Sequence, residues 1–347
     1  MLRAGIAGAT GYAGIELIRL LGLHPEVQVV WAGTESYQGQ ELAAVYPHLR
    51  GRVDLVGQEA AAEALAGCDV VFTSLPHGVT MTLAPAVLSA GTRLIDLGAD
   101  FRLRDVAAYE AWYKKAHTAP DLVAEAVYGL PELYRERVRG ARLVANPGCY
   151  PTACALAAAP LLRAGAVSLE GIIFDAKSGV SGAGRGVSLG VHFSEVNENF
   201  KAYNIAGDHR HTPEIEQTLS DLAGGPVLVS FTPHLVPMTR GILATGYFTL
   251  RGSWTTEQLV DLFREFYAEE PFVRVRPAGD LPTTKQVWGS NYCDIGLKVD
   301  PRTGRVLVVS VIDNLVKGAA GQAIQNMNLM FGLPETTGLL QAAPLYP

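Results

Sequence analysis

The chain is poor in the features that mark secreted, membrane-spanning and nucleic-acid-binding proteins. It has four cysteines in 347 residues and no Cys-x-x-Cys pair, so neither a disulfide framework nor a cysteine-based zinc site is expected. The opening MLRAGIAGATG reaches glycine too soon for the apolar core of a signal peptide. The most apolar stretch, residues 153–165, is interrupted by Pro160 and Arg163, which argues against a membrane span. We therefore expect a cytoplasmic protein with reduced thiols.

The net charge of the chain also excludes some classes of partner. Lys and Arg number 28 against 34 Asp and Glu, a net charge of −6, and there is no long basic run. Nucleic acid and anionic membranes are therefore not expected as partners. Hydrophobic residues make up 48% of the chain, enough at this length for a substantial core in two domains.

The first half of the chain alternates short apolar runs with helical patterns. The runs fall at residues 2–7, 27–33, 69–75, 93–100 and 142–148, and the helical patterns at residues 13–22, 58–67 and 79–91. Apolar runs without period-two alternation, separated by helices, indicate a parallel sheet covered on both faces. The sequence thus predicts an α/β domain of the Rossmann type, with a doubly wound parallel sheet.

The second half has more strands and fewer helices. Strand patterns fall at residues 171–179, 226–237, 241–252, 272–277, 291–300 and 305–314. An amphipathic helix is expected over 255–270, with Thr255 or Thr256 as its cap. We predict an α+β domain with a mixed or antiparallel sheet at 149–315. Residues 1–148 would form the dinucleotide-binding domain, completed by the C-terminal segment 316–347, whose helical pattern covers residues 318–332.

A glycine pattern lies between the first strand and the first helix. Gly8, Gly11 and Gly14 in GATGYAG have the spacing that lets a backbone turn sharply and approach a pyrophosphate at a helix N-terminus. The alternative is a tight turn with no ligand. Because the pattern follows an apolar strand and precedes an amphipathic helix, we favour a dinucleotide site.

The type of dinucleotide stays open. Glu35 follows the second strand, 21 residues past Gly14, where an acid usually accepts the ribose 2′-hydroxyl of NAD and repels a 2′-phosphate. Thr34, Ser36 and Tyr37 could instead donate to a phosphate. The sequence therefore favours neither NAD nor NADP decisively.

Cys149 lies at the exit of an apolar strand and the start of a helix, in NPGCYPT. A thiol at a helix N-terminus meets the positive end of the helix dipole, which lowers its pKa. A free cysteine is more often a small buried hydrophobe, and Cys154, five residues into the helix, is interpreted in that way. For Cys149 the local setting favours a nucleophile.

Two histidines form a second cluster. His209 and His211 flank Arg210 in GDHRHTPEIEQ, and Glu214 follows at the start of a helix. A lone histidine is usually a packed or surface residue, whereas this group suits acid–base chemistry and anion binding. The loop at 175–186 is rich in small residues, a composition that suits close approach to phosphate or nicotinamide but also describes a flexible surface loop.

Four motifs follow GATGYAG in order: ANPGCYPT, KSGVSGAGR, HRHTPEI and DNLVKGAAGQAIQ. With these the chain resembles the N-acetyl-gamma-glutamyl-phosphate reductase family of arginine biosynthesis, a relative of aspartate-semialdehyde dehydrogenase. The resemblance implies NADPH-dependent reduction of N-acetyl-L-glutamyl 5-phosphate to N-acetyl-L-glutamate 5-semialdehyde, with release of inorganic phosphate. It also implies a thioester on Cys149 and a base in the histidine pair, with His211 preferred to His209. A homodimer or homotetramer is expected, with no metal.

From the motifs themselves and from the resemblance, we expect two sets of ligand-binding residues. For the cofactor, NADP with NAD not excluded because of Glu35, they are Gly8, Thr10, Gly11, Tyr12, Gly14, Ser36, Pro76, His77, Ser178, Gly179, Gly182, Asn314 and Lys317. For the substrate or phosphate they are Arg102, Asn146, Ser181, Arg185, Glu214 and Arg240.

Three other functions are alternatives to this interpretation of the sequence. A relative in lysine biosynthesis acts on a carrier-protein-linked aminoadipyl phosphate, but it lacks the NPGCYPT form and the SGVSGAGR segment. Short-chain reductases use Tyr-x-x-x-Lys, and no tyrosine here has lysine four residues on. A non-catalytic, nucleotide-binding regulator would leave Cys149 unreactive.

Overall fold

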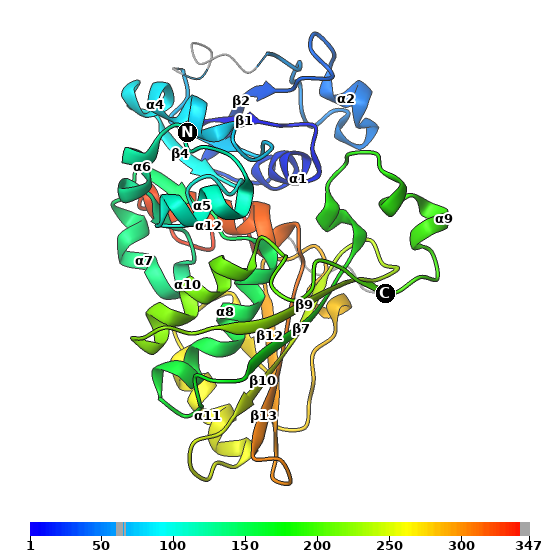
Figure 1. Ribbon diagram of the computed structural model, residues 1–347. Coiled ribbons are helices and arrows are strands. Elements are labelled where there is room, and N and C mark those ends of the chain that lie inside the picture. The colour runs from blue at the N-terminus through cyan, green and yellow to red at the C-terminus, as the bar shows by residue number, and fades with distance from the viewer. Residues whose placement is uncertain (60–64, 66, 341–347) are drawn as a thin grey trace. The chain divides into compact units, whose positions relative to one another are not determined.

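A computed structural model describes residues 1–59, 65 and 67–340. The chain forms two compact units (Figure 1). Unit 1 comprises Met1–Pro147 and the described residues from Ala319 onward, and unit 2 comprises Gly148–Gly318. The chain thus crosses between the units just before Cys149 and just after Gly318.

Unit 1 is built on a six-stranded sheet in the order β2-β1-β3-β4-β6-β5, and every strand pair in it is parallel. Its strands are β1 (Leu2–Ala7), β2 (Val27–Gly33), β3 (Val70–Thr73), β4 (Arg93–Asp96), β5 (Val127–Tyr128) and β6 (Leu143–Ala145). The predicted doubly wound parallel sheet is confirmed. The central strands β3, β4 and β6 are almost entirely buried, because helices cover the sheet.

The helices of unit 1 include several that the sequence did not predict. They are α1 (Tyr12–Leu21), α2 (Leu42–Val45), α4 (Thr80–Ser89), α5 (Val106–Tyr113), α6 (Pro120–Glu125), α7 (Pro131–Arg139) and α12 (Gly321–Met330). Helices α5–α7 and the two-residue β5 were missed because they are short and have no sustained apolar period. The helix expected over 58–67 falls largely on residues 60–64 and 66, which lie outside the described residues.

The last helix lies close to the predicted residues 318–332. The segment begins as a π-helical turn over Val316–Ala320, continues as α12, and ends at Met330. Gly332 has a φ of +69°, and Pro334 follows, so the backbone cannot continue as an α-helix there. Helix α12 packs on α7, α1 and β4. Residues 341–347 lie outside the described residues.

Unit 2 contains a seven-stranded sheet in the order β11-β12-β13-β10-β7-β9-β8. Its strands are β7 (Ile172–Ser178), β8 (Lys201–Ala202), β9 (Val229–Leu235), β10 (Ile242–Thr249), β11 (Val273–Val275), β12 (Cys293–Asp300) and β13 (Arg305–Ile312). Two strand pairs are parallel and four are antiparallel. The predicted mixed sheet is confirmed.

Helices lie against one face of this sheet (Figure 1). They are α8 (Cys149–Arg163), α10 (Thr212–Ala223) and α11 (Thr256–Phe266), while the short α9 (Phe193–Val196) lies in the loop after β7. Thr255 caps α11 by accepting from the Gln258 N–H, which decides between the two predicted caps. Burial alternates along β7 and β10, so one face is packed and the other is half-buried.

No helix within the described residues combines the length and the apolar character needed to cross a bilayer. Cys68, Cys149, Cys154 and Cys293 are free thiols.

Candidate active site

The glycine motif forms a tight turn between β1 and α1 of unit 1. Gly8 has a φ of +84°, and a Cβ there would collide with the Ser74 carbonyl oxygen, so glycine is required. A Cβ at Gly14 would collide with the Gly8 carbonyl oxygen, so α1 can begin this close to the turn only without a side chain. Gly11 is the N-cap of α1 and offers no side-chain cap. These are the features of a phosphate-binding helix N-terminus.

Hydrogen bonds connect the turn to the end of β2 and to the segment that follows it. The hydroxyls of Thr10 and Thr34 lie 2.8 Å apart, and the Tyr46 hydroxyl donates to the Thr10 carbonyl at 2.7 Å. Glu35 and Ser36 follow at once and are exposed. Their side chains are thus accessible at the strand end where a ribose would bind.

Residues after β3, β4 and β6 support the same edge of the unit 1 sheet. Pro76 is exposed, and the His77 ring lies against Tyr113 with centroids 5.0 Å apart. Arg102 is buried, and its Nε donates to the Asn146 carbonyl at 2.8 Å. The Asn146 amide accepts from Asn326 and donates to the Ala319 carbonyl, both at 3.1 Å. Arg102 and Asn146 therefore both brace the segment that leads to Cys149.

Asp96, at the end of β4, was not singled out by the sequence. Its carboxylate is fully buried and its Oδ1 accepts from the hydroxyls of Thr73 and Thr80 and from the Gly98 N–H. Burial, with the nearby charge of Asp100, raises the pKa of Asp96 to about 6. The core of unit 1 thus contains a carboxyl group whose pKa lies well above that of an ordinary aspartate.

Cys149 is the first residue of α8 in unit 2, and Gly148 is the N-cap. It is partly exposed, whereas the other three cysteines are buried, and burial raises the pKa of Cys154 well above its ordinary value. The buried Glu214 carboxylate of α10 accepts from the Gly148 N–H at 2.8 Å. This contact holds the turn before the thiol against the start of α10.

The two histidines lie beside that turn. The His211 backbone N–H donates to Nδ1 of His209 at 3.1 Å, and the two ring centroids are 4.9 Å apart. The Tyr150 ring lies edge-on to both, at 5.6 Å from His209 and 6.0 Å from His211. Burial, with the charge of Arg210, lowers the pKa of His209 to about 4. His209 is therefore neutral at pH 7, and because its Nδ1 accepts, its proton is on Nε2.

Sequence reasoning missed two tyrosines in this cluster. The hydroxyls of Tyr150 and Tyr203 lie 3.2 Å apart, and that of Tyr150 donates to the His234 carbonyl at 3.3 Å. Burial, with the nearby charge of Cys149, raises the pKa of both phenols, that of Tyr203 to about 12. Both hydroxyls stay protonated close to the thiol. Tyr150 could have been found as the neighbour of Cys149, whereas no pattern marks Tyr203.

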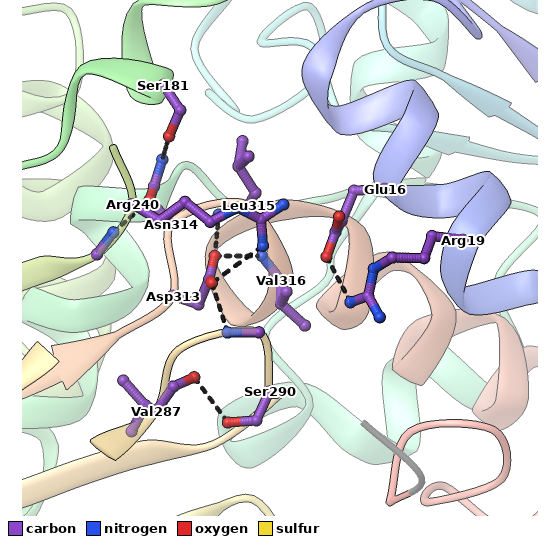
Figure 2. A network of polar contacts seen from close by, with 12 residues as sticks. Glu16, Arg19, Ser181, Arg240, Val287, Ser290, Asp313, Asn314, Leu315 and Val316 are labelled. Atoms are coloured by element: carbon purple, nitrogen blue, oxygen red, sulfur yellow. Dashed lines mark hydrogen bonds and ion pairs between the residues drawn. The ribbon is translucent and has the colours of Figure 1, made fainter. Parts of the chain in front are cut away.

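A polar network joins the loops at one end of the unit 2 sheet (Figure 2). Asn314 accepts from the Gly241 N–H at 2.7 Å and donates to the Ser181 hydroxyl at 3.0 Å. The Arg240 guanidinium is paired with the fully buried Asp313 at 3.2 Å. The network places Ser181, Arg240 and Asn314 together.

The remaining candidates of unit 2 lie within four residues of Ser181 or Asn314 in the sequence. The buried Ser178 hydroxyl donates to the Gly179 carbonyl at 3.0 Å. Gly182 and Arg185 are exposed. Lys317 is fully buried, with Nζ 5.8 Å from the centre of the Phe272 ring.

The predicted site residues therefore fall into two sets. Unit 1 holds Gly8, Thr10, Gly11, Tyr12, Gly14, Ser36, Pro76, His77, Arg102 and Asn146, and unit 2 holds Cys149, Ser178, Gly179, Ser181, Gly182, Arg185, His209, His211, Glu214, Arg240, Asn314 and Lys317. Among residues 1–59, 65 and 67–340, no three His, Cys, Asp or Glu side chains form a group that could hold a metal.

Two family models match the chain. Residues 3–141 match the semialdehyde dehydrogenase NAD binding domain, and residues 149–314 match the semialdehyde dehydrogenase dimerisation domain. Among solved structures, an aspartate semialdehyde dehydrogenase II from Vibrio cholerae aligns with a TM-score of 0.74 at 18% identity, over 96% of this chain and 98% of that one. An aspartate semialdehyde dehydrogenase with NADP from Candida albicans aligns with a TM-score of 0.73 at 19% identity, over 95% and 98%. At these identities the likeness concerns the fold.

Curated relatives are much nearer in sequence. An N-acetyl-gamma-glutamyl-phosphate reductase from Symbiobacterium thermophilum is 86% identical over 100% of this chain and 99% of its own length. A protein of the same name from Desulforamulus reducens is 58% identical over the full length of both. The chain therefore belongs to the semialdehyde dehydrogenase family, in the group whose curated members are named N-acetyl-gamma-glutamyl-phosphate reductase.

Proposed function

We propose that the protein reduces N-acetyl-L-glutamyl 5-phosphate to N-acetyl-L-glutamate 5-semialdehyde with NADPH, releasing inorganic phosphate, through a thioester on Cys149. The observation that carries the proposal is the position of Cys149, which is partly exposed at the N-terminus of α8 beside the His209–His211 pair. The name shared by the 86% and 58% identical relatives supports the substrate. That shared name does not favour a carrier-protein-linked aminoadipyl phosphate.

The thiol is activated by its place in the helix. The partial positive charge at the start of α8 favours the thiolate over the thiol. The thiolate attacks the acyl carbon, the carbon–sulfur bond forms, and phosphate leaves with the electrons of the carbon–oxygen bond. The protonated hydroxyls of Tyr150 and Tyr203 are donors near the oxygen that becomes negative in this step.

The two histidines have different proposed roles. His209 is neutral and holds its proton on Nε2, so it serves as a donor that orients the substrate. His211 serves as the base that takes the proton of the thiohemiacetal hydroxyl in the oxidative direction and returns it in reduction. Glu214 is proposed to keep the N-cap of α8, and with it Cys149, in position relative to the two histidines.

Positive charge is available for the anionic groups of the substrate. Arg240, fixed by Asp313, is proposed to bind phosphate or carboxylate together with the Ser181 hydroxyl, with the exposed Arg185 contributing charge. In unit 1, Arg102, besides bracing Asn146, is also proposed to bind phosphate or carboxylate.

The glycine turn suits a dinucleotide. A Cβ at Gly8 or Gly14 would fill the space where the turn meets α1, and backbone N–H groups at a helix start suit a pyrophosphate. We propose that Gly8, Thr10, Gly11, Tyr12 and Gly14 hold the phosphates. Ser36 would lie at the ribose, and Pro76, His77, Ser178, Gly179, Gly182, Asn314 and Lys317 at the nicotinamide end. When bound, the cofactor supplies the reducing equivalents. NADP is preferred, although the exposed Glu35 would also admit NAD.

The enzyme is proposed to act in the cytoplasm as a homodimer or homotetramer. Four free thiols suit a reducing compartment. Ile173, Leu243, Tyr247 and Val309 lie on the half-buried face of the unit 2 sheet, and a second copy would cover these apolar side chains. The matched dimerisation domain model agrees with this proposal.

The test is a substrate panel. Acetylated and free semialdehydes are assayed with phosphate and either NAD or NADP, with Cys149→Ala as the matched control. Turnover should be greatest with N-acetylglutamate semialdehyde and NADP and should vanish in the variant. Ordinary activity in Cys149→Ala would refute the mechanism, and preference for another semialdehyde would refute the substrate.

A further inference from the structure

We propose that the turn Asp313–Gly318 positions both Cys149 and Arg240, with Gly318 acting on Cys149 by close approach and Asp313 acting on Arg240 by an ion pair. This inference rests on the proposed role of Cys149 as the nucleophile. Neither Asp313 nor Gly318 would touch substrate, so both are positioning residues.

The first observation is the packing of Gly318 against the carbon that bears the thiol. A Cβ at residue 318 would lie 2.7 Å from the Cys149 Cβ, 3.2 Å from its Cα and 3.3 Å from the Ile312 Cδ1. Two of these three atoms belong to the first residue of α8, whose backbone continues into a helix packed on β10 and β13. They cannot move away as the end of a flexible side chain can. A side chain at residue 318 would therefore displace Cys149 or the turn itself.

The second observation is that the turn is rigidly held at its start. Asp313 is fully buried, and its carboxylate accepts from the N–H groups of Gly289 at 2.8 Å, Leu315 at 2.8 Å and Val316 at 3.2 Å, besides pairing with Arg240. Figure 2 shows these contacts converging on one carboxylate. A buried carboxylate with several donors keeps its neighbours in one arrangement, because losing any donor leaves charge unsatisfied.

The third observation is the shape of the segment between the two ends. Val316–Ala320 is a π-helical turn, a rare conformation that occurs often at functional sites. Within unit 2, Gly318 lies five residues beyond Asp313, so this one short turn connects the Arg240 ion pair to the Cys149 contact. The distance between thiol and guanidinium is thereby set by one element, and a shift of about 1 Å in such a distance can cost about a hundredfold in rate.

The test compares two glycine-to-alanine variants of the whole enzyme. Gly318→Ala introduces the contact with Cys149, whereas Gly246→Ala, on β10, introduces a contact of 2.6 Å with the Phe248 ring and of 3.1 Å with the Phe174 ring. The control is thus as crowded but touches only aromatic core residues. Both receive kcat and KM measurements, thermal melting, and the rate of alkylation of Cys149 by iodoacetamide, followed by mass spectrometry of its peptide.

In Gly318→Ala, kcat should fall about tenfold or more and the alkylation rate should change about threefold or more, whereas Gly246→Ala should lose stability and keep both rates. The proposal is overturned if Gly318→Ala keeps kcat and the alkylation rate. It is also overturned if Gly246→Ala changes both as strongly at an equal loss of melting temperature.

A second pair decides the matter if Gly318→Ala does not fold. Asp313→Asn removes the charge that holds Arg240. Asp294→Asn removes the same charge from another buried carboxylate, which pairs with the partly exposed Arg274 at 2.6 Å across β11 and β12. Asp313→Asn should raise the KM for phosphate about fivefold or more and alter the alkylation rate. Asp294→Asn should do neither. Equal effects in the two variants would overturn the proposal.

Alkylation separates this inference from the proposed function, since it needs no substrate. If the wild-type enzyme has no activity with N-acetylglutamate semialdehyde, the proposed function is refuted. The alkylation rates would still show whether Gly318 positions the thiol.

Discussion

The two units offer ligand-binding groups of different kinds. In unit 1 the glycine turn can form because Gly8 and Gly14 have no side chains, which would collide with backbone carbonyls. In unit 2 the candidate groups are side chains held by other side chains, such as Asn314 between Gly241 and Ser181. The first kind is specified by a few adjacent residues. The second requires the whole fold.

This difference predicts how each unit responds to substitution. A backbone turn should tolerate changes nearby but fail when a single glycine gains a side chain. In a side-chain network, each substitution should lower the catalytic rate by an amount that depends on the contacts of the residue that is replaced. The variants that follow test that contrast.

The largest effect is expected in unit 2, at the histidine pair. His211→Asn should lower kcat by about 10²- to 10⁴-fold, because it removes the proposed base. His209→Asn should lower it less and raise KM, because the neutral His209 is proposed only to orient the substrate. Steady-state kinetics in both directions are the measurement. The assignment would be reversed if His209→Asn were the more damaging of the two for kcat.

The matching change in unit 1 is Gly8→Ala. A residue with a side chain is strained at a φ of +84°, and its Cβ would strike the Ser74 carbonyl. Cofactor affinity should fall about tenfold or more, while the alkylation rate of Cys149 without cofactor stays unchanged. Titration of nucleotide binding by calorimetry, with Gly140→Ala as the control whose Cβ meets no atom within 4 Å, provides the check. A changed alkylation rate would mean that the turn also shapes the thiol site.

Stability should respond to pH with opposite signs in the two units. Asp96 has its pKa raised from 3.8 to about 6, so the native state keeps a proton that the unfolded chain loses, and stability falls as pH rises from about 4 to 6. His209 has its pKa lowered from 6.5 to about 4, so between these pH values the unfolded chain binds a proton that the native state does not bind. Stability then falls as pH drops from about 6.5 to 4.

Single variants should unmask each contribution. In Asp96→Asn, the free energy of unfolding should rise more steeply with pH between about pH 4 and 6 than in the wild type. In His209→Gln, it should rise less steeply or fall. Each variant should differ from the wild type by roughly 1–3 kcal/mol in the change of unfolding free energy over this range. Urea unfolding across that range measures both. Identical pH profiles for wild type and Asp96→Asn would show that the buried carboxyl group does not titrate there.

The smallest effect concerns cofactor choice. Replacing the exposed Glu35 with serine should raise the ratio of kcat/KM for NADP to that for NAD by about threefold to tenfold at low salt, because a carboxylate repels a 2′-phosphate. The change should shrink at high salt. An unchanged ratio would indicate that Glu35 does not approach the ribose.

What could be predicted from the sequence follows the same contrast. The parallel sheet of unit 1, the mixed sheet of unit 2, the glycine turn and the position of Cys149 at a helix start are all marked by neighbouring residues. The contact of Gly148 with Glu214, 66 residues away, and that of Ser181 with Asn314, 133 residues away, leave no local pattern. Tyr203, Asp96 and the close approach of Gly318 to Cys149 were missed for this reason.

Short elements were missed on other grounds. Helices α5–α7 have too few turns for an apolar period to emerge, and β5 spans only Val127–Tyr128. The last helix, by contrast, was predicted to end at residue 332, and it ends at Met330, two residues before the left-handed backbone at Gly332.

The central claim, an acyl thioester on Cys149, is tested most directly by a rapid-mixing experiment in the oxidative direction without phosphate. Enzyme, N-acetylglutamate semialdehyde and NADP should give a burst of close to one equivalent of NADPH per chain, then stop until phosphate releases the acyl group. Cys149→Ala should give no burst. Steady turnover without phosphate and without a burst, or a burst that survives in Cys149→Ala, would contradict the account.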